Sequence, residues 1–313
     1  MSDSADDSCA MLVASARRFA TEVIAPMVGV DGRDGALEEL GGVLTQADDL
    51  GLVSHMYAGG PSAAAQMHEE LAVACAGVAA SVLFAGIGAA AFEQFVASAD
   101  NSSSQDEVRA LRRVAVVPQL PWLPAVFELV GDGDGWRLAG AHDFVYAAPD
   151  SDALLVEVGS RHALVRLDAL EPAEQLHRSG LAACCIRRVE FDALRLEASQ
   201  VRDIDELRAG ATAVRLWLGL CAIAIGNARG ALDQARRYAE ERYQGGAQIG
   251  RHAAVQLLVG GAEARITVAR AALSHLATST DPRALAMLKV RCLAECADAV
   301  SDVAVAVEAV AVA

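Results

Sequence analysis

The segment from Glu206 to Arg242 places the strongest constraint on the fold of this chain. Its apolar residues follow helical spacing on several faces, so it reads as one long helix that ends before Gly245-Gly246. A helix that is apolar on more than one face must pack against partners on more than one side. Ile249–Ala277 predicts a second long helix, and Pro282 stands where the first turn of a third is expected. We therefore expect residues 203–313 to form a helical bundle that is shared between subunits.

Helical spacing also dominates residues 1–113. Ser8 is expected to cap a first helix that runs through Ala25 and is ended by Pro26. Further helices are predicted over Leu37–Leu50, Ser62–Cys75 and Val78–Ala97, with a short one after the polar break Asn101–Ser104. This part of the chain is predicted to be an N-terminal helical domain.

The pattern changes between residues 114 and 202. Prolines cluster at positions 118, 121 and 124, and a hairpin is predicted from Phe127–Val130 and Trp136–Leu138 around the turn Gly131–Gly135. Further strands are predicted over Ala153–Val158, His162–Leu167 and Cys185–Phe191. We expect a small middle domain built as a β-barrel or sandwich.

The charge balance is typical of a protein with no nucleic-acid partner. The 313 residues include 41 acidic and 26 basic side chains, for a formal net charge of −15, whereas contact with phosphate backbones needs a clustered basic surface. The histidines show no ligand spacing, and no glycine-rich stretch follows a strand as a phosphate loop requires. We therefore expect neither a metal site nor a nucleic-acid interface.

The cysteines and the two ends of the chain favour a cytoplasmic protein. Seven cysteines are scattered without a Cys-x-x-Cys pair, which disfavours a disulfide framework or a zinc site. Residues 1–9 are polar and acidic and do not resemble a signal peptide. The apolar stretch Cys292–Ala313 is interrupted by acidic residues from Glu295 to Glu308, so we expect no membrane span.

The order of a helical, a β-rich and a helical part resembles the acyl-CoA dehydrogenase family. Short motifs support the resemblance over nearly the whole chain, and they are Arg18–Pro26, Asp49–Leu52, Asp134–Gly140 and Val189–Leu194. The resemblance implies an α+β fold in three parts, with an N-terminal α domain at 1–113, a middle β domain at 114–202 and a C-terminal helical bundle at 203–313.

The residues after the long helix carry the resemblance furthest. In the family this helix ends in Arg-x-x-Phe-Gly-x-x-Ile, and the arginine holds the FAD pyrophosphate of a neighbouring subunit. Here Arg242 and Gly246 are retained, whereas Gly245 replaces the phenylalanine. The resemblance assigns cofactor binding to Arg242, Gln244, Ile249 and His252. The alternative is that Arg242 is a surface cation at a helix C-terminus, where the helix dipole favours it.

The same resemblance leaves the catalytic base without a position. The family's reaction needs a glutamate that removes the α-proton of an acyl-CoA thioester. One family position for it lies 26 residues before the arginine, which is Leu216 here, and leucine accepts no proton. The other follows a Gly-Gly turn, where this sequence has Glu308–Ala313 without glycines. We therefore expect no catalytic residue in this chain.

Other family positions near substrate and flavin are also changed. Val214 and Trp217 stand where the family has Asp-x-x-Arg, and we expect Trp217 to pack rather than to act in catalysis. Val117–Pro124 lacks the family's Thr-Glu-Pro and Gly-Ser-Asp residues. Phe144–Tyr146 replaces the Trp-Ile-Thr strand that covers the flavin ring. We expect this strand to be repacked after loss of its own flavin, with stacking by Phe144 as the alternative.

These losses resemble one class of the family, the α2β2 heterotetramers of actinobacterial steroid side-chain catabolism, in which one of two dissimilar subunits carries the glutamate. We expect this chain to be the non-catalytic subunit. A second family subunit would supply the base, the acyl-CoA pocket and most of the FAD site, and the acyl group would be bulky. Two alternatives stay open. One is an independent flavoenzyme with a relocated base such as Glu206, and the other is a flavin-free structural homo-oligomer.

Overall fold

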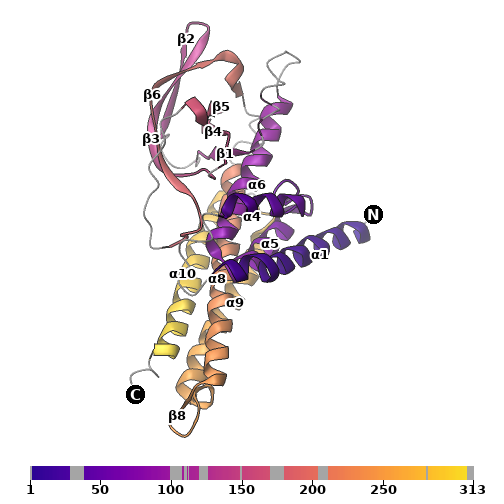
Figure 1. The fold of residues 1–313 in the computed structure, drawn as a ribbon, viewed down its shortest axis with the longest axis vertical. Helices are drawn as coiled ribbons and strands as arrows, with labels where there is room; N and C mark the ends of the chain where they lie inside the picture. The colour runs from indigo at the N-terminus through magenta and orange to yellow at the C-terminus, as the bar shows by residue number, and fades with distance from the viewer. Residues whose placement is uncertain are drawn as a thin grey trace. The chain divides into compact units, whose positions relative to one another are not determined.

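The structure of the chain is a computed structural model, which describes residues 2–28, 39–98, 108, 111, 113–119, 126–148, 150–169, 180–203, 211–279 and 281–308. These residues form two compact units (Figure 1). The first unit comprises the described residues of Met1–Val28, Met56–Ala80 and Trp217–Ala313, and the second comprises those of Gly29–His55 and Ser81–Leu216. Each unit is treated separately below.

The first unit is entirely helical apart from one small hairpin. Its helices are α1 (Ser2–Phe19), a π-helical turn (Ala20–Ile24), α2 (Ala25–Met27), α5 (Gly60–Ala74), most of α8 (Ala211–Glu241), α9 (Ala253–Leu276) and α10 (Pro282–Glu308). Helix α9 lies along α10, and α1 packs against α5. The long helix α8 confirms the helix predicted to end before Gly245-Gly246. The beginning of that prediction, residues 206–210, lies outside the described residues.

The first helix differs from its prediction at both ends. Ser8 lies inside α1, which begins at Ser2, so Ser8 is not an N-cap and that prediction is wrong. The helical path also continues past Pro26 to Met27. A π-helical turn makes this possible, because the N–H of Ala25 bonds to the carbonyl of Ala20, five residues earlier. Pro26 then falls in the first turn of α2, where a missing N–H has no cost.

Glycines allow α8 to approach α5 closely. A Cβ atom at Gly226 would collide with the carbonyl oxygen of Glu69, and one at Gly230 would lie 2.5 Å from the carbonyl oxygen of Val73. Real Cβ atoms do not approach other atoms so closely, so these positions require glycine. The two backbones are therefore in contact along this part of the helices.

The second unit carries two sheets. One has the strand order β1-β4-β5-β7, formed by β1 (Val114–Val117), β4 (Ala153–Val158), β5 (Arg161–Arg166) and β7 (Val201–Asp203). Strand β1 runs parallel to β4, and the other pairs are antiparallel. The second sheet is antiparallel, with the order β2-β3-β6, formed by β2 (Phe127–Asp132), β3 (Gly135–Tyr146) and β6 (Ile186–Glu197). Two helices also belong to this unit, the short α4 (Leu40–Asp49) and most of the longer α6 (Ala76–Ala97).

The predicted α+β fold class is confirmed, with one correction to the middle domain. The described strands form two separate sheets, so they do not close into a barrel. The hairpin predicted around residues 131–135 is present, and its turn is tighter than predicted. Gly133 has a φ of +66° at the first central position, as a two-residue type II′ turn requires.

The pairing of β3 with β6 contains an irregularity that decides where side chains point. The register shifts between His142 and Val145, as in a β-bulge. Inside this bulge the backbone N–H of Phe144 donates to Nδ1 of His142 at 2.9 Å instead of to the neighbouring strand. The result is that Phe144 is exposed, while Val145 and Tyr146 are both buried.

Two helices, α6 and α8, are long and apolar enough to cross a membrane by length and composition alone. In each, 67% of the most apolar window is buried inside the fold. Core helices of soluble proteins meet the same criterion, so these two helices do not establish a membrane span.

Candidate functional site

The segment after α8 forms a short hairpin at the far end of that helix (Figure 1). Strands β8 (Tyr243–Gln244) and β9 (Ala247–Gln248) pair across Gly245 and Gly246. These glycines have φ values of +61° and +81°, and a type I′ turn needs a positive φ at both central residues. The sequence predicted a break at this point but not the hairpin. We call residues 242–252 the arm.

The backbone of Arg242 is fixed while its side chain is exposed. Its N–H donates to the carbonyl of Tyr238 at 2.9 Å, and its own carbonyl accepts from the N–H of Ile249 at 2.9 Å. Among the described residues, the guanidinium makes no hydrogen bond or ion pair. It therefore keeps its full fork of donors, which suits a pyrophosphate or a carboxylate.

Two of the predicted arm residues hold the arm rather than extend from it. Ile249 is only 1% exposed and packs in a cluster with Ala239, Val255 and Ala306. His252 lies on the inner side of the hairpin, where its Nε2 is 3.0 Å from the carbonyl oxygen of Gln244. Since a carbonyl only accepts, Nε2 must carry the proton. Both side chains fix the hairpin on the helical bundle.

Gln244 is the predicted arm residue with an unmet polar atom. Its Oε1 is buried and has no hydrogen-bond partner among the described residues. Buried acceptors in folded proteins nearly always have a donor, so this oxygen is a candidate acceptor for a hydrogen bond from a ligand. A ligand that brings hydroxyl groups and a negative charge would satisfy both Gln244 and Arg242. FAD, the cofactor implied by the sequence resemblance, has both features.

Gly245 explains why the aromatic residue of the family motif does not fit this arm. A Cβ at this position would contact Cε1 of His252 at 3.4 Å, and the φ of +61° is strained for any residue with a side chain. Tyr243, which the sequence analysis did not single out, is the aromatic residue that the arm exposes instead, with 66% of its surface accessible. Its exposure depends on the hairpin, which local sequence did not predict.

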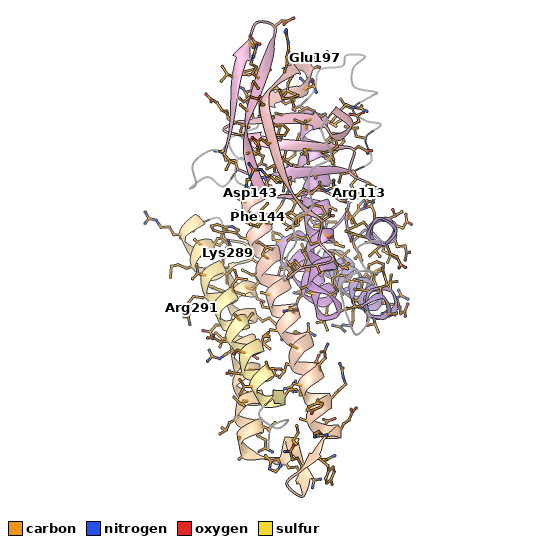
Figure 2. All side chains as sticks on the ribbon, turned by 60° about the vertical axis from the view of Figure 1, so that its left-hand side comes forward. Arg113, Asp143, Phe144, Glu197, Lys289 and Arg291 are labelled. Carbon is orange, nitrogen blue, oxygen red and sulfur yellow. The ribbon has the colours of Figure 1, made fainter. Side chains whose placement is uncertain are left out.

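The position expected for the catalytic base carries no acid. Leu216 is half-buried on α8, and Val214 stands two residues before it. Trp217 is 6% exposed, and the ammonium of Lys289 lies 5.2 Å from the centre of its ring. Lys289 is the chain's single lysine and is labelled in Figure 2. Its cation–π contact with Trp217 is a packing arrangement. Glu206, the alternative base, lies outside the described residues.

The strand expected to cover a flavin ring separates its two aromatic residues. Phe144, labelled with Asp143 in Figure 2, is 67% exposed. Tyr146 is 3% exposed and stacks on Phe84 of α6, with ring centroids 5.0 Å apart. Burial raises the pKa of the Tyr146 phenol, so the hydroxyl stays protonated. Tyr146 is thus part of the core.

A buried polar cluster in the second unit was missed by the sequence analysis. The carboxylate of Glu157 accepts hydrogen bonds from the hydroxyl of Thr212 at 2.6 Å and from the backbone N–H of Gln119 at 3.1 Å. His162 Nε2 lies 3.3 Å from the same carboxylate. The hydroxyl contacts the carboxylate and not the imidazole, so the cluster lacks the order of a nucleophile activated by histidine. Within the second unit, it ties the first residues of α8 to β4, β5 and the segment after β1.

Among the residues that the structure describes, no group of three or more His, Cys, Asp or Glu side chains could hold a metal ion. The seven cysteines are free thiols, most of them buried. The sequence segment Val117–Pro124 is described only as far as Gln119, so its comparison with the family's flavin-contacting residues lies partly outside the described residues.

One known protein family matches the part of the chain that includes the arm. Residues 215–308, which include the arm, match the family model "Acyl-CoA dehydrogenase, C-terminal domain". The match covers less than a third of the chain. A search of curated proteins found no significant match.

Solved structures match over almost the whole chain. A glutaryl-coenzyme A dehydrogenase in complex with glutaryl-CoA superposes with a TM-score of 0.76 at 16% identity, covering 95% of this chain and 85% of the other. A glutaryl-CoA dehydrogenase from Mycobacterium smegmatis in complex with FADH2 gives 0.75 at 18%, covering 92% and 81%. A FAD-dependent dehydrogenase gives 0.72 at 19%, covering 96% and 87%. The fold is acyl-CoA dehydrogenase-like. At these identities the likeness concerns the fold and not the activity.

Proposed function

We propose that this chain is the non-catalytic subunit of a heteromeric, FAD-dependent acyl-CoA dehydrogenase. The observation that carries the proposal is the contrast between Leu216 and Arg242 on one helical segment. The position of the base is apolar, while the residue expected to reach a neighbour's cofactor is exposed and has unused donors. A subunit that had lost both functions would not need to keep the arm.

In the proposed complex, the partner subunit holds the acyl-CoA and the carboxylate that removes its α-proton. FAD, when bound there, supplies the acceptor for the β-hydride. This chain contributes Arg242 to the pyrophosphate, because a guanidinium fork pairs well with phosphate oxygens. Gln244 accepts a hydrogen bond from the cofactor. Ile249 and His252 keep the hairpin in the conformation that presents both residues.

The rest of the proposal follows the resemblance to heteromeric family members. The complex is an α2β2 tetramer in the cytoplasm, its C-terminal helices form the subunit core, and its substrate is a bulky acyl-CoA such as a steroid side chain. The division into parts at residues 113 and 202 is likewise retained as a proposal.

Expression of the chain alone and together with a family subunit encoded beside it tests this function. We expect the chain alone to be colourless or insoluble, and the co-expressed pair to be soluble and yellow with bound FAD. A chain that binds FAD and oxidises an acyl-CoA by itself would support the independent enzyme. A soluble, colourless homo-oligomer that ignores the family subunit would contradict the proposal and support a structural role.

A further inference from the structure

The helices of the first unit line a pocket of about 430 Å³ that is open to solvent and belongs neither to the arm nor to the position of the base. Helix α8 lines it with residues spaced by three and four, and α9 does the same, so each helix presents one face. Residues of α1 and α5 complete the wall. The apolar part of the lining includes Leu232 and Ile266, whose side chains are almost fully buried.

One end of the pocket has more positive than negative charge. Arg17 binds both oxygens of Glu70 at 3.1 Å through two of its nitrogens. Arg270 forms a similar fork on Glu69, at 2.6 to 3.2 Å. Arg229 then donates a single nitrogen, Nη1, to Glu69 at 2.6 Å and to Glu70 at 3.2 Å. We call these five residues the arginine end.

The arginine end has three guanidinium groups and two carboxylates. Burial raises the pKa of Glu70, but the hydrogen bonds and charges of Arg17 and Arg229 outweigh burial and hold this pKa below its ordinary value. The carboxylate of Glu70 therefore stays charged. Each guanidinium has five N–H groups, and the three groups use only part of them on the two carboxylates. All three arginines line the pocket, and N–H groups not used on the carboxylates are available for a further anion.

The opposite end of the pocket has more negative than positive side chains. There Arg236 pairs with Glu263 and lies 3.9 Å from Asp233, which gives one cation and two carboxylates. Arg229 and Arg236 are separated by two turns of α8, or about 10 Å along the helix. The pocket therefore carries a net positive end, an apolar middle and a net negative end.

We propose that this pocket binds a small organic anion with a short apolar body, and that it favours a ligand whose far end is positive. The carboxylate or phosphate of the ligand contacts the arginine end, and its carbon chain lies against Leu232 and Ile266. A second negative group would face Asp233 and Glu263 and be repelled. The preferred class is thus a zwitterion or a monoanion, and not a dianion.

Three six-carbon ligands that differ only at one end test this preference. Calorimetric titration of the full-length chain, alone or with its partner, should show the affinity order ε-aminocaproate, caproate, adipate. We expect about a tenfold difference between the first and the last, since the charge at the far end changes sign within a few ångströms of two carboxylates. Inorganic phosphate serves as the probe for an anion without an apolar body and should bind more weakly than caproate.

Two substitutions at opposite ends of the pocket should change the three affinities in different patterns. Arg17→Gln should weaken all three ligands, because it removes a cation from the arginine end. Glu263→Gln should strengthen adipate and weaken ε-aminocaproate, a reversal that partial unfolding cannot produce. Arg291→Gln is the matched control. It removes another exposed, ion-paired arginine, on α10, that does not line the pocket, and should change nothing.

Absence of binding by every ligand at millimolar concentration would overturn the proposal, as would equal affinity for the three ligands, or a Glu263→Gln variant in which the ratio of the ε-aminocaproate and adipate affinities is unchanged. These measurements involve neither flavin nor acyl-CoA oxidation. Their failure would leave the proposed role of the arm untouched, and failure of that role would leave the pocket untouched.

Discussion

The arm and the end of β3 are two of the regions where the family resemblance expects contact with a flavin, and they differ in what they expose. In the arm, Arg242 is exposed and its side chain is unpaired among the described residues, while the residues beneath it are packed. At the end of β3, Tyr146 is buried against Phe84, and only Phe144 faces solvent. One region keeps polar groups available for a ligand, and the other uses its aromatic residue as core. This difference is what the proposal of a chain that serves a neighbour's cofactor rests on.

The largest expected effect is a loss of stability that should differ between the two aromatic residues of β3. Tyr146→Ala should lower the free energy of unfolding by about 3–5 kcal/mol, because it removes a large buried side chain and leaves a cavity. Phe144→Ala is the matched control and should change it by less than about 0.5 kcal/mol, since the ring is exposed. Urea denaturation measures both. Equal losses in the two variants would show that Phe144 also packs, and the contrast would fail.

The turn of the arm gives the next effect. Gly245→Val should destabilise the hairpin locally by about 1–3 kcal/mol, because a β-branched residue is strained at a positive φ. Hydrogen exchange of the amides in residues 242–248 should accelerate, whereas global unfolding should change little. Ala247→Val, on the adjoining strand, is the control and should leave exchange unchanged. Slow exchange in both variants would mean that the hairpin does not depend on this glycine.

The bulge beside Phe144 adds a pH dependence to the β3 region. Partial burial lowers the pKa of His142, and the nearby Asp143 offsets only part of this effect. The folded state therefore favours the neutral ring, whose Nδ1 accepts the N–H of Phe144. This stability is present above the unfolded pKa of about 6.5 and is lost as the pH falls below it.

The pH prediction is tested by comparing His142→Asn with the unaltered chain from pH 7.5 to pH 5. The free energy of unfolding should fall less steeply in the variant, because asparagine does not titrate. Parallel curves for the two proteins would mean that His142 binds protons equally in the folded and unfolded states.

Much of the fold follows from local patterns in the sequence. The long helix α8, the strand Ala153–Val158 and the hairpin around Gly133 were predicted because each depends on residues close together in the chain. The π-helical turn before Pro26 was not predicted, since a proline after helical residues normally indicates the end of the helix. Strand β1 was missed as well, because the prolines that follow it suggested irregular structure and its pairing with β4 is not local.

Local sequence patterns predict even less of the candidate sites than of the fold. Arg242 could be identified because it belongs to a contiguous motif, whereas the hairpin that presents it depends on a turn with two positive φ angles. The arginine end of the pocket joins residues as distant as Arg17, Glu69 and Arg270. No local pattern relates these positions, and their charges look like ordinary solvated helix faces in the sequence. Only packing of four helices brings them together.

The smallest expected effect on stability belongs to the residue with the largest expected effect on function. Arg242→Ala should change the free energy of unfolding by less than about 0.5 kcal/mol, because the side chain is exposed and makes no contact among the described residues that would be lost. Arg237→Ala, which alters another exposed arginine of α8, is the matched control. Thermal unfolding should be the same for both variants, and a marked loss in Arg242→Ala alone would assign the residue a structural role.

Flavin content of the co-purified complex tests the central claim most directly. We predict that the complex containing Arg242→Ala loses most of its FAD, while the complex containing Arg237→Ala retains it and both assemble normally. Full FAD occupancy in the Arg242→Ala complex would contradict the claim that this chain holds a cofactor for its neighbour.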